Sequence, residues 1–266
     1  MISVALNSLS VLQFSNLSQY PELMHFSSTR IGGMSTANYS SLNLGLNSGD
    51  EHENVIINRK VVSAALGIRE DRLIFPKQTH TTTVKVIREN FLSVTVENRR
   101  LYLLDTDAII TNLKGVCVAV KTADCVPILL YDPKRMVVAA IHAGWKGTLQ
   151  NIVVKTIQKM ADEFGSYPAD IIAGIGPSIS PEVYEVGPDV YMQFDEEYST
   201  PTNPVRNDKR LLNLWKANRE QLINAGIPSD HIEIAGLCTL SDPEGFFSAR
   251  RDGAKTGRMG SGIMIK

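Results

Sequence analysis

The chain has 266 residues, of which 43% are hydrophobic, and a formal net charge of -1 at pH 7. A chain of this length buries roughly 75% of its extended surface when it folds as one domain, so it can build a substantial core. A near-neutral chain without a long basic run is a poor ligand for nucleic acid. The opening MISVALNSLSVLQF lacks a basic region and a continuous apolar stretch, and no segment is long and apolar enough to span a membrane. We therefore expect a cytoplasmic protein without nucleic-acid or membrane partners.

The three cysteines, Cys117, Cys125 and Cys238, cannot all pair within the chain, and none forms a CxxC motif. A disulfide framework is therefore not expected. No low-complexity linker or fixed-period repeat divides the sequence. These observations predict a single domain over residues 1–266, and we expect a monomer or a weak homo-oligomer.

The first predicted helix covers residues 51–66. Asp50 followed by Glu53 has the spacing of a capping box, apolar residues recur behind this pair, and Gly67 is a typical C-terminal stop. β-branched and apolar runs then predict strands at 83–87, 107–111, 116–121, 126–131 and 136–141.

The last two predicted strands are separated by the short, turn-rich stretch 132–135, which predicts an antiparallel hairpin. Cys125 immediately precedes the first strand of this hairpin, and His142 immediately follows the second. Antiparallel pairing returns these two positions to the same end of the sheet. The local pattern therefore predicts that Cys125 and His142 lie close together.

Two further helices follow the hairpin. One begins near Thr148, keeps its apolar residues on one face and ends before Gly165, and the other covers 211–225. Strands grouped around a central hairpin and flanked by helices predict an α+β fold, with antiparallel sheet covered by helices.

Three residues at or near the edges of predicted strands, His80, Cys125 and His142, offer two imidazoles and a thiolate. A closed structural zinc site takes four protein ligands, whereas three leave one position for water or substrate. This set is therefore typical of a catalytic zinc site. A metal-free alternative uses Cys125 as a nucleophile and His142 as its base, as in Cys/His hydrolases.

Motifs along nearly the whole chain resemble those of the YfiH family, also called the laccase-domain or multicopper polyphenol oxidoreductase family. The site motifs are Q-x-H in FPKQTHTTTVKVI, A-D-C-x-P in KTADCVPILLYD, and H-A-G-W-K-G. Further similar segments are HFSSTRIGGMS, SSLNLGLNSGD, DTDAIIT, GIGPSISPEVYEVG and CTLSDPEGFFSARRDGAKTGRMG.

The resemblance implies an α/β/β/α sandwich with largely antiparallel sheets, and zinc bound by the catalytic residues His80, Cys125 and His142. It also implies a purine nucleoside phosphorylase that acts on adenosine, inosine and S-methyl-5′-thioadenosine with phosphate, and that deaminates adenosine. The usual zinc-deaminase signature, H-x-E followed by P-C-x-x-C, is absent from the sequence. Any deamination would therefore use a different scaffold.

Several side chains are candidates for binding the substrate. Arg30 lies in a glycine-rich turn suited to phosphate, and Arg59 lies in the first predicted helix. The amides of Asn43 and Gln78 suit bidentate recognition of adenine. Asp124 is beside Cys125, where it would contact substrate, orient a histidine or move a proton.

For other residues, the sequence supports a structural role at least as well as a role in the site. Asp105 and Asp107 are acidic candidates for the same site, with turn capping as the alternative. The C-terminal arginines, Arg250, Arg251 and Arg258, are interpreted as structural partners of nearby carboxylates.

Three further functions remain open from the sequence. The family resemblance includes members linked to peptidoglycan-precursor editing, which keeps a Cys/His amidase as an alternative. A copper-dependent polyphenol oxidase is another, although multicopper chemistry needs a histidine-rich cluster and the chain has only five histidines. Copper would still bind the nitrogen and sulfur ligands in vitro. A metal-binding interaction protein without turnover is the third, and Cys238 would then be a fourth ligand.

Overall fold

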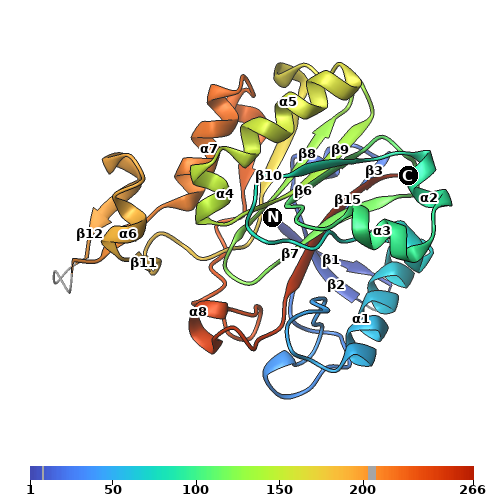
Figure 1. Cartoon of the computed structure of the whole chain (residues 1–266), viewed down its shortest axis with the longest axis horizontal. Helices are drawn as coiled ribbons and strands as arrows, with labels where there is room; N and C mark the ends of the chain where they lie inside the picture. The colour runs from blue at the N-terminus through green and yellow to red at the C-terminus, as the bar shows by residue number, and fades with distance from the viewer. Residues whose placement is uncertain (8, 203–207) are drawn as a thin grey trace.

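Two six-stranded sheets packed face to face form the centre of the molecule (Figure 1). The computed structural model describes residues 1–7, 9–202 and 208–266. Helices cover the outer face of each sheet, so the layers follow the order α/β/β/α. The predicted α+β sandwich with largely antiparallel sheets is confirmed.

The first sheet joins the two ends of the chain. Its last strand in sequence, β15, lies between β3 and β7 and is antiparallel to both, whereas β4 runs parallel to β7. In spatial order the strands are β1 (Ile2–Leu6), β2 (Leu9–Gln13), β3 (Leu23–Ser28), β15 (Met259–Ile265), β7 (Cys117–Thr122) and β4 (Leu73–Ile74).

The second sheet contains the predicted hairpin. Its two strands, β8 and β9, pair antiparallel with Pro127 opposite His142, which confirms the predicted hairpin. In spatial order the strands are β14 (Ile232–Ile234), β10 (Ile172–Ile175), β8 (Val126–Asp132), β9 (Val137–Ala143), β6 (Ala108–Thr111) and β5 (Val84–Ile87).

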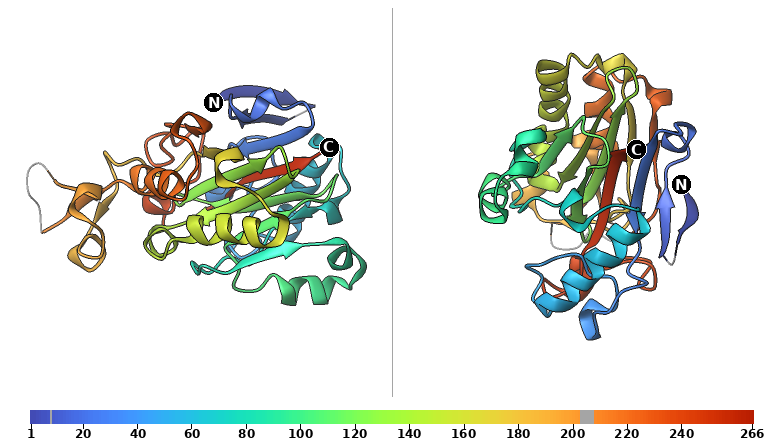
Figure 2. Two further views of the ribbon diagram at one scale, coloured as in Figure 1. Left: turned by 90° about the horizontal axis from the view of Figure 1, so that it is seen from above. Right: turned by 90° about the vertical axis from the view of Figure 1, so that its right-hand side faces the viewer.

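The side chains of β8 alternate between the two faces of its sheet and pack against the layer on each side. Leu129 and Tyr131 face the first sheet and pack in one buried cluster with Ile263 of β15. Ile128 and Leu130 point to the opposite face, where helices cover them. The covering helices are α5 (Ile152–Phe164) and α7 (Leu214–Asn224) on the second sheet and α1 (His52–Ala65) on the first (Figures 1 and 2).

Three local predictions about helices were wrong in detail. The helix predicted from 148 to 164 is interrupted, because Asn151 has a left-handed φ of 59° and separates α4 (Trp145–Leu149) from α5. The predicted capping box is absent: Glu51 is the N-cap of α1 without a side-chain cap bond, and Asp50 accepts hydrogen bonds from Ser35 and Asn43 instead. The third helix begins only at Leu214, because 210–212 form a strand.

A small third sheet projects from one side of the sandwich, with α6 (Pro188–Tyr191) packed beside it (Figure 2). Its strands, in spatial order, are β11 (Glu185–Val186), β13 (Arg210–Leu212) and β12 (Ser199–Pro201). The other short helices are α2 (Glu89–Ser93), α3 (Val96–Tyr102) and α8 (Ala249–Asp252), with 3-10 turns at Leu17–Gln19, Ala37–Tyr39, Glu70–Arg72, Pro168–Asp170, Glu196–Tyr198 and Ser229–His231. None of the helices in the described part of the chain combines the length and hydrophobicity that a membrane span requires.

Candidate metal centre

His80, Cys125 and His142 converge on one point at the end of the β8–β9 hairpin. One potential ligand atom of each lies within 4.8 Å of the other two. The Cys125 Sγ and His80 Nε2 atoms are 3.8 Å apart, and the two imidazole rings are 4.9 Å apart, centroid to centroid. The predicted proximity of Cys125 and His142 is therefore confirmed, and His80 lies beside them.

Two of the three residues lie where the chain crosses from one sheet to the other. His80 is in the loop between β4 of the first sheet and β5 of the second, and Cys125 is in the turn between β7 and β8. His142 is on β9, in the centre of the second sheet. The site therefore depends on the packing of the two sheets, because neither sheet alone carries all three groups.

Gly144 permits the close approach of the three side chains. A Cβ atom at this position would lie 3.0 Å from Cys125 Sγ and 3.0 Å from His80 Cδ2. Both are tighter than ordinary van der Waals contacts, so a larger residue would displace the thiol or the imidazole. The glycine of the H-A-G-W-K-G motif thus has a direct role in the shape of the site.

Asp107 is a fully buried carboxylate that connects two of the three residues. Its Oδ1 lies 2.7 Å from His142 Nδ1, which directs Nε2 of that imidazole toward Cys125. The same carboxylate accepts hydrogen bonds from the backbone amides of Thr79, His80 and Thr81, at 3.2, 3.1 and 2.8 Å. Asp107 therefore holds both the ring of His142 and the loop that carries His80.

The strand register explains this position of Asp107. In the antiparallel pairing of β6 with β9, Ala108 lies opposite Ile141, so the preceding Asp107 lies beside His142. The amide of His142 also donates to the Asp107 carbonyl at 2.8 Å. Sequence reasoning left Asp107 between histidine orientation and turn capping. The pairing of β6 with the hairpin places Asp107 beside His142 and therefore decides in favour of histidine orientation.

The thiol and the imidazoles strongly affect one another's charge. Burial alone would raise the pKa of the Cys125 thiol, but the charge and hydrogen bond of His142, aided by those of His80, outweigh it and lower the pKa to about 6. Burial opposes protonation of His142, yet the Cys125 thiolate and Asp107 raise its pKa to about 9. Without a metal, each group therefore favours the charged form of the other, the Cys125 thiolate and the His142 imidazolium.

The donor set and its spacing fit a small tetrahedral cation. With zinc bonds of about 2.0–2.1 Å to nitrogen and about 2.3 Å to sulfur, neighbouring ligand atoms lie roughly 3.3–3.6 Å apart. The 3.8 Å between Cys125 Sγ and His80 Nε2 requires only a small contraction. Among the described residues, Cys238 is not part of this group, and its sulfur accepts hydrogen bonds from Ser180 and Ser241. Three protein ligands leave a position open, which favours catalysis over a closed structural site.

Two predicted substrate-binding residues border the site but contact the protein itself. The Asp124 carboxylate accepts hydrogen bonds from the Thr239 hydroxyl and the Arg250 amide, both at 2.7 Å. The Gln78 side chain accepts from the Lys121 amide at 2.9 Å and donates to the Lys121 carbonyl at 2.7 Å. These bonds align the backbone segments that carry Cys125 and His80.

The other three predicted substrate-binding residues lie in or against the loop that follows β3. Arg30 donates to the carbonyls of Ser40 and Pro243, both at 2.8 Å. Asn43 is fully buried, and its amide is used within the protein. Arg59 donates twice to the Leu44 carbonyl from α1, at 3.1 and 2.8 Å.

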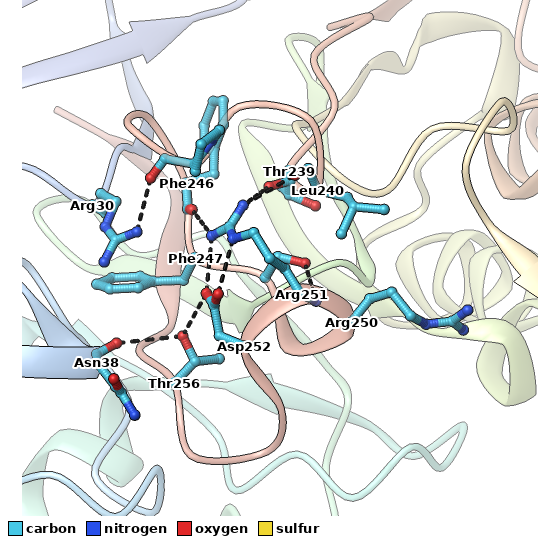
Figure 3. Close-up of polar contacts among 12 residues, drawn as sticks. Arg30, Asn38, Thr239, Leu240, Phe246, Phe247, Arg250, Arg251, Asp252 and Thr256 are labelled. Carbon is cyan, nitrogen blue, oxygen red and sulfur yellow. Dashed lines mark hydrogen bonds and ion pairs between the residues drawn. The ribbon is translucent and has the colours of Figure 1, made fainter.

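The C-terminal arginines differ in their partners. Arg251 forms a bidentate ion pair with Asp252 and donates to the carbonyls of Thr239, Leu240 and Phe246, so its interpretation as a structural residue is confirmed (Figure 3). Arg258 was interpreted in the same way, and this was wrong. Its guanidinium contacts backbone carbonyls, and within the described residues it pairs with no carboxylate.

Two further groups lie near the thiol: Arg258, which the sequence analysis interpreted as structural, and Tyr184, which it did not single out. Burial lowers the pKa of the Arg258 guanidinium, and the charge of the Cys125 thiolate partly offsets this. Burial and then the Cys125 thiolate raise the pKa of Tyr184, whose ring lies 5.1 Å from the Arg250 guanidinium. Both residues come from segments far from Cys125 in sequence, so no local motif indicates them.

Comparisons with known proteins agree with this fold. A family model described as the multi-copper polyphenol oxidoreductase laccase matches residues 24–266. A purine nucleoside phosphorylase of Bacteroides thetaiotaomicron is 42% identical over 259 residues, 96% of each chain. Adenosine deaminase RL5, from an unknown prokaryotic organism, is 37% identical over 246 residues, 91% of this chain and 93% of the relative. The crystal structure of the hypothetical protein YfiH of Bacillus licheniformis superimposes with a TM-score of 0.87 at 33% identity, over 97% of each chain.

Proposed function

The chain belongs to the multi-copper polyphenol oxidoreductase laccase family, and within it we propose a zinc-dependent purine nucleoside phosphorylase that also deaminates adenosine. The proposed substrates are phosphate with adenosine, inosine or S-methyl-5′-thioadenosine. The observation that carries the proposal is the three-ligand group of His80, Cys125 and His142, aligned by Asp107, in a chain 42% identical to a purine nucleoside phosphorylase. Its free thiols also suit a cytoplasmic location, and the proposed state is a monomer or weak homo-oligomer.

Each residue of the site has a defined task in this proposal. His80, Cys125 and His142 would hold a zinc ion, which supplies Lewis-acid chemistry when bound. Asp107 accepts the Nδ1 proton of His142, fixes its tautomer and leaves Nε2 for the metal. Cys125 is ready to bind as a thiolate, because its pKa is lowered to about 6.

The two reactions change different bonds of the nucleoside. In phosphorolysis, a phosphate oxygen forms a bond to C1′ of the ribose while the C1′–N9 bond breaks, and the purine keeps the electron pair and takes up a proton. In deamination, water adds at C6 and ammonia leaves. Phosphate is consumed only in the first reaction, so its presence separates the two activities.

The test is incubation of zinc-quantified protein with adenosine, with and without phosphate, followed by chromatography of the products. We expect phosphate-dependent adenine and ribose 1-phosphate, and inosine that forms without phosphate. Cys125→Ala should lose both zinc and turnover, whereas Cys238→Ala, the same change at a thiol outside the ligand group, should keep both. A silent zinc-loaded wild-type protein would refute the proposal, as would stable zinc binding by Cys125→Ala.

A second candidate is a Cys/His amidase that acts on peptidoglycan precursors. It is supported by the lowered pKa of Cys125 and by the 2.7 Å contact of Asp107 with His142, because a nucleophile, a base and an orienting carboxylate are the parts of such a site. Zinc dependence separates the candidates, since a thiolate bound to zinc is no longer a free nucleophile. An amidase would work after chelation, and the phosphorylase would not.

Copper chemistry has less support. The same three ligands would take up copper in vitro, because copper outcompetes zinc on nitrogen and sulfur donors. A multicopper oxidase also needs a histidine-rich cluster, whereas this chain has five histidines. The buried His25 contacts the Phe14 amide, and His231 contacts the Ile171 carbonyl. We therefore restrict copper to adventitious oxidation of phenols at the zinc site.

A further inference from the structure

Three cationic side chains from distant segments meet beside the metal centre. We name Arg59 of α1, Lys121 of β7 and Arg258, which immediately precedes β15, the cationic cluster. The Arg59 guanidinium lies 4.7 Å from the centroid of the Phe75 ring, and Lys121 Nζ lies 5.3 Å from the same centroid. Arg59 donates to the Leu44 carbonyl, and the Leu44 amide in turn donates to the Arg258 carbonyl at 3.0 Å.

Asp107 acts electrostatically on Lys121 and Asp124 on Arg258, but neither carboxylate is paired with these charges. Within residues 1–7, 9–202 and 208–266, none of the three side chains forms an ion pair. Their hydrogen bonds go to backbone carbonyls, and Lys121 has a single such bond, to Pro76 at 2.6 Å. Arg251 shows the contrast, because Asp252 and three carbonyls occupy its guanidinium (Figure 3).

The three side chains of the cluster are partly buried and repel one another. Burial lowers the pKa of Lys121 well below its ordinary value, the charges of Arg59 and Arg258 lower it further, and Asp107 acts in the opposite direction. Burial also lowers the pKa of Arg59 to about 10. Partly buried positive charges without a paired counter-ion are unfavourable, and their partial exposure lets an anion reach them, so an anion bound among them would stabilise the arrangement. Some donors remain for such an anion, since Arg59 Nη1 and Arg258 Nε make no hydrogen bond within the described chain.

The cluster lies beside the metal centre. Hydrogen bonds of its backbone and electrostatic interactions of its side chains both connect it to that site. The backbone of Lys121 pairs with Gln78, two residues before His80. Asp107, which holds His142, acts electrostatically on Lys121, and the Cys125 thiol acts on Arg258. An anion in the cluster would therefore lie next to a substrate held at the open metal position.

We propose that Arg59, Lys121 and Arg258 form the binding site for the inorganic phosphate dianion. This inference rests on the proposed phosphorylase function and names the residues that supply its second substrate. Three cations that approach from α1, β7 and the segment before β15 match a tetrahedral dianion, which accepts hydrogen bonds in several directions. Bound there, the phosphate would be held beside the nucleoside with an oxygen free to attack C1′.

The test compares Lys121→Met with Lys114→Met, which removes one positive charge from an exposed position just before the same strand. Phosphate binding to the zinc-loaded protein is measured by calorimetry without nucleoside, and phosphorolysis is measured with phosphate varied. Lys121→Met should raise the Kd and the KM for phosphate at least about 10-fold, while the KM for adenosine stays within about twofold. Lys114→Met should match the wild type.

Arg258→Gln provides a second variant, because Lys121 packs against Phe75 and its replacement can disturb folding. It should weaken phosphate binding in the same way, with zinc content unchanged. Wild-type phosphate affinity in folded Lys121→Met and Arg258→Gln proteins would overturn the inference. Absence of phosphate binding by the wild type at millimolar concentration would overturn it too.

The binding measurement also separates this inference from the proposed function. In one outcome, the wild type binds phosphate but converts adenosine only to inosine, and both variants lose phosphate binding. This outcome would overturn phosphorolysis and retain the cluster as a phosphate site. Phosphorolysis that both variants perform with the wild-type KM for phosphate would retain the function and overturn the cluster.

Discussion

At the scale of single residues, Asp107 contributes most to the geometry of the site without being one of its three ligands. One carboxylate oxygen faces the His142 ring, and both oxygens accept amide hydrogen bonds from residues 79–81. Burial would raise the pKa of Asp107, but the hydrogen bond and charge of His142, with Thr81, lower it to about 2. The carboxylate is therefore charged throughout the physiological range and always available to orient the imidazole.

Asp107→Asn should weaken zinc binding roughly 10- to 100-fold, because the amide removes the negative charge that fixes the His142 tautomer. A chelator competition titration measures the affinity, and turnover should fall with it. Asp105→Asn is the matched control, since the carboxylate of this exposed neighbour accepts a hydrogen bond from the Thr79 hydroxyl at 3.0 Å and none from an imidazole of the described residues. Equal zinc affinity of Asp107→Asn and wild type would contradict the role assigned to Asp107.

At the scale of secondary-structure elements, a second buried histidine holds the N-terminal strands together. His25 on β3 is 2% exposed, and its Nε2 accepts a hydrogen bond from the Phe14 amide, just after β2, at 2.8 Å. Burial lowers the pKa of His25 to about 4. The histidine is therefore neutral in the folded chain down to acidic pH, whereas in the unfolded chain it gains a proton near pH 6.5.

This difference predicts a specific acid sensitivity. Above pH 6.5 His25 is neutral in both states, and between pH 6.5 and pH 4 only the unfolded chain binds the proton, so the free energy of unfolding falls as pH falls. The loss should reach roughly 3 kcal/mol at pH 4. Denaturant titrations of wild type and His25→Gln over this range measure it, because glutamine lacks the ionisation. Parallel pH profiles for the two proteins would contradict the prediction, and His52→Gln at the exposed start of α1 should follow the wild type.

At the scale of the whole molecule, the metal centre lies at the junction of the two sheets. The loop with His80 and the turn with Cys125 both cross from the first sheet to the second, and His142 is fixed within the second. A bound metal would therefore link the sheets directly. The buried hydrophobic clusters between and outside the sheets hold the layers together, so we expect the chain to fold without the metal.

Zinc should raise the melting temperature without being required for folding. At a free zinc concentration about 100 times the Kd the stabilisation is roughly 2.7 kcal/mol, which corresponds to about 5–10 °C for a chain of this size. Scanning calorimetry of chelated and zinc-loaded protein measures the shift, and the chelated protein should still unfold cooperatively. Cys125→Ala should show no zinc-dependent shift. Loss of the cooperative transition on chelation would show instead that the metal is structural.

The sequence was sufficient for the local parts of this protein. Apolar spacing predicted α1, and β-branched and apolar runs predicted the strands β5 to β9, because both signals lie in neighbouring residues. The hairpin predicted that Cys125 and His142 meet, since a short turn determines the pairing. The sequence was less reliable for the ends of helices. The helix break at Asn151 and the missing capping box before α1 depend on contacts outside the local segment.

Only the tertiary structure decided which distant segments meet. The pairing of β3 with β15 joins residues near the two ends of the chain, and no local pattern specifies such a partner. The same holds for Asp107 beside His142 and for the cationic cluster of Arg59, Lys121 and Arg258. The physical reason is that a residue type shows which interactions a side chain can make, whereas the charge, burial and partners that determine its role arise only when the sheets pack together.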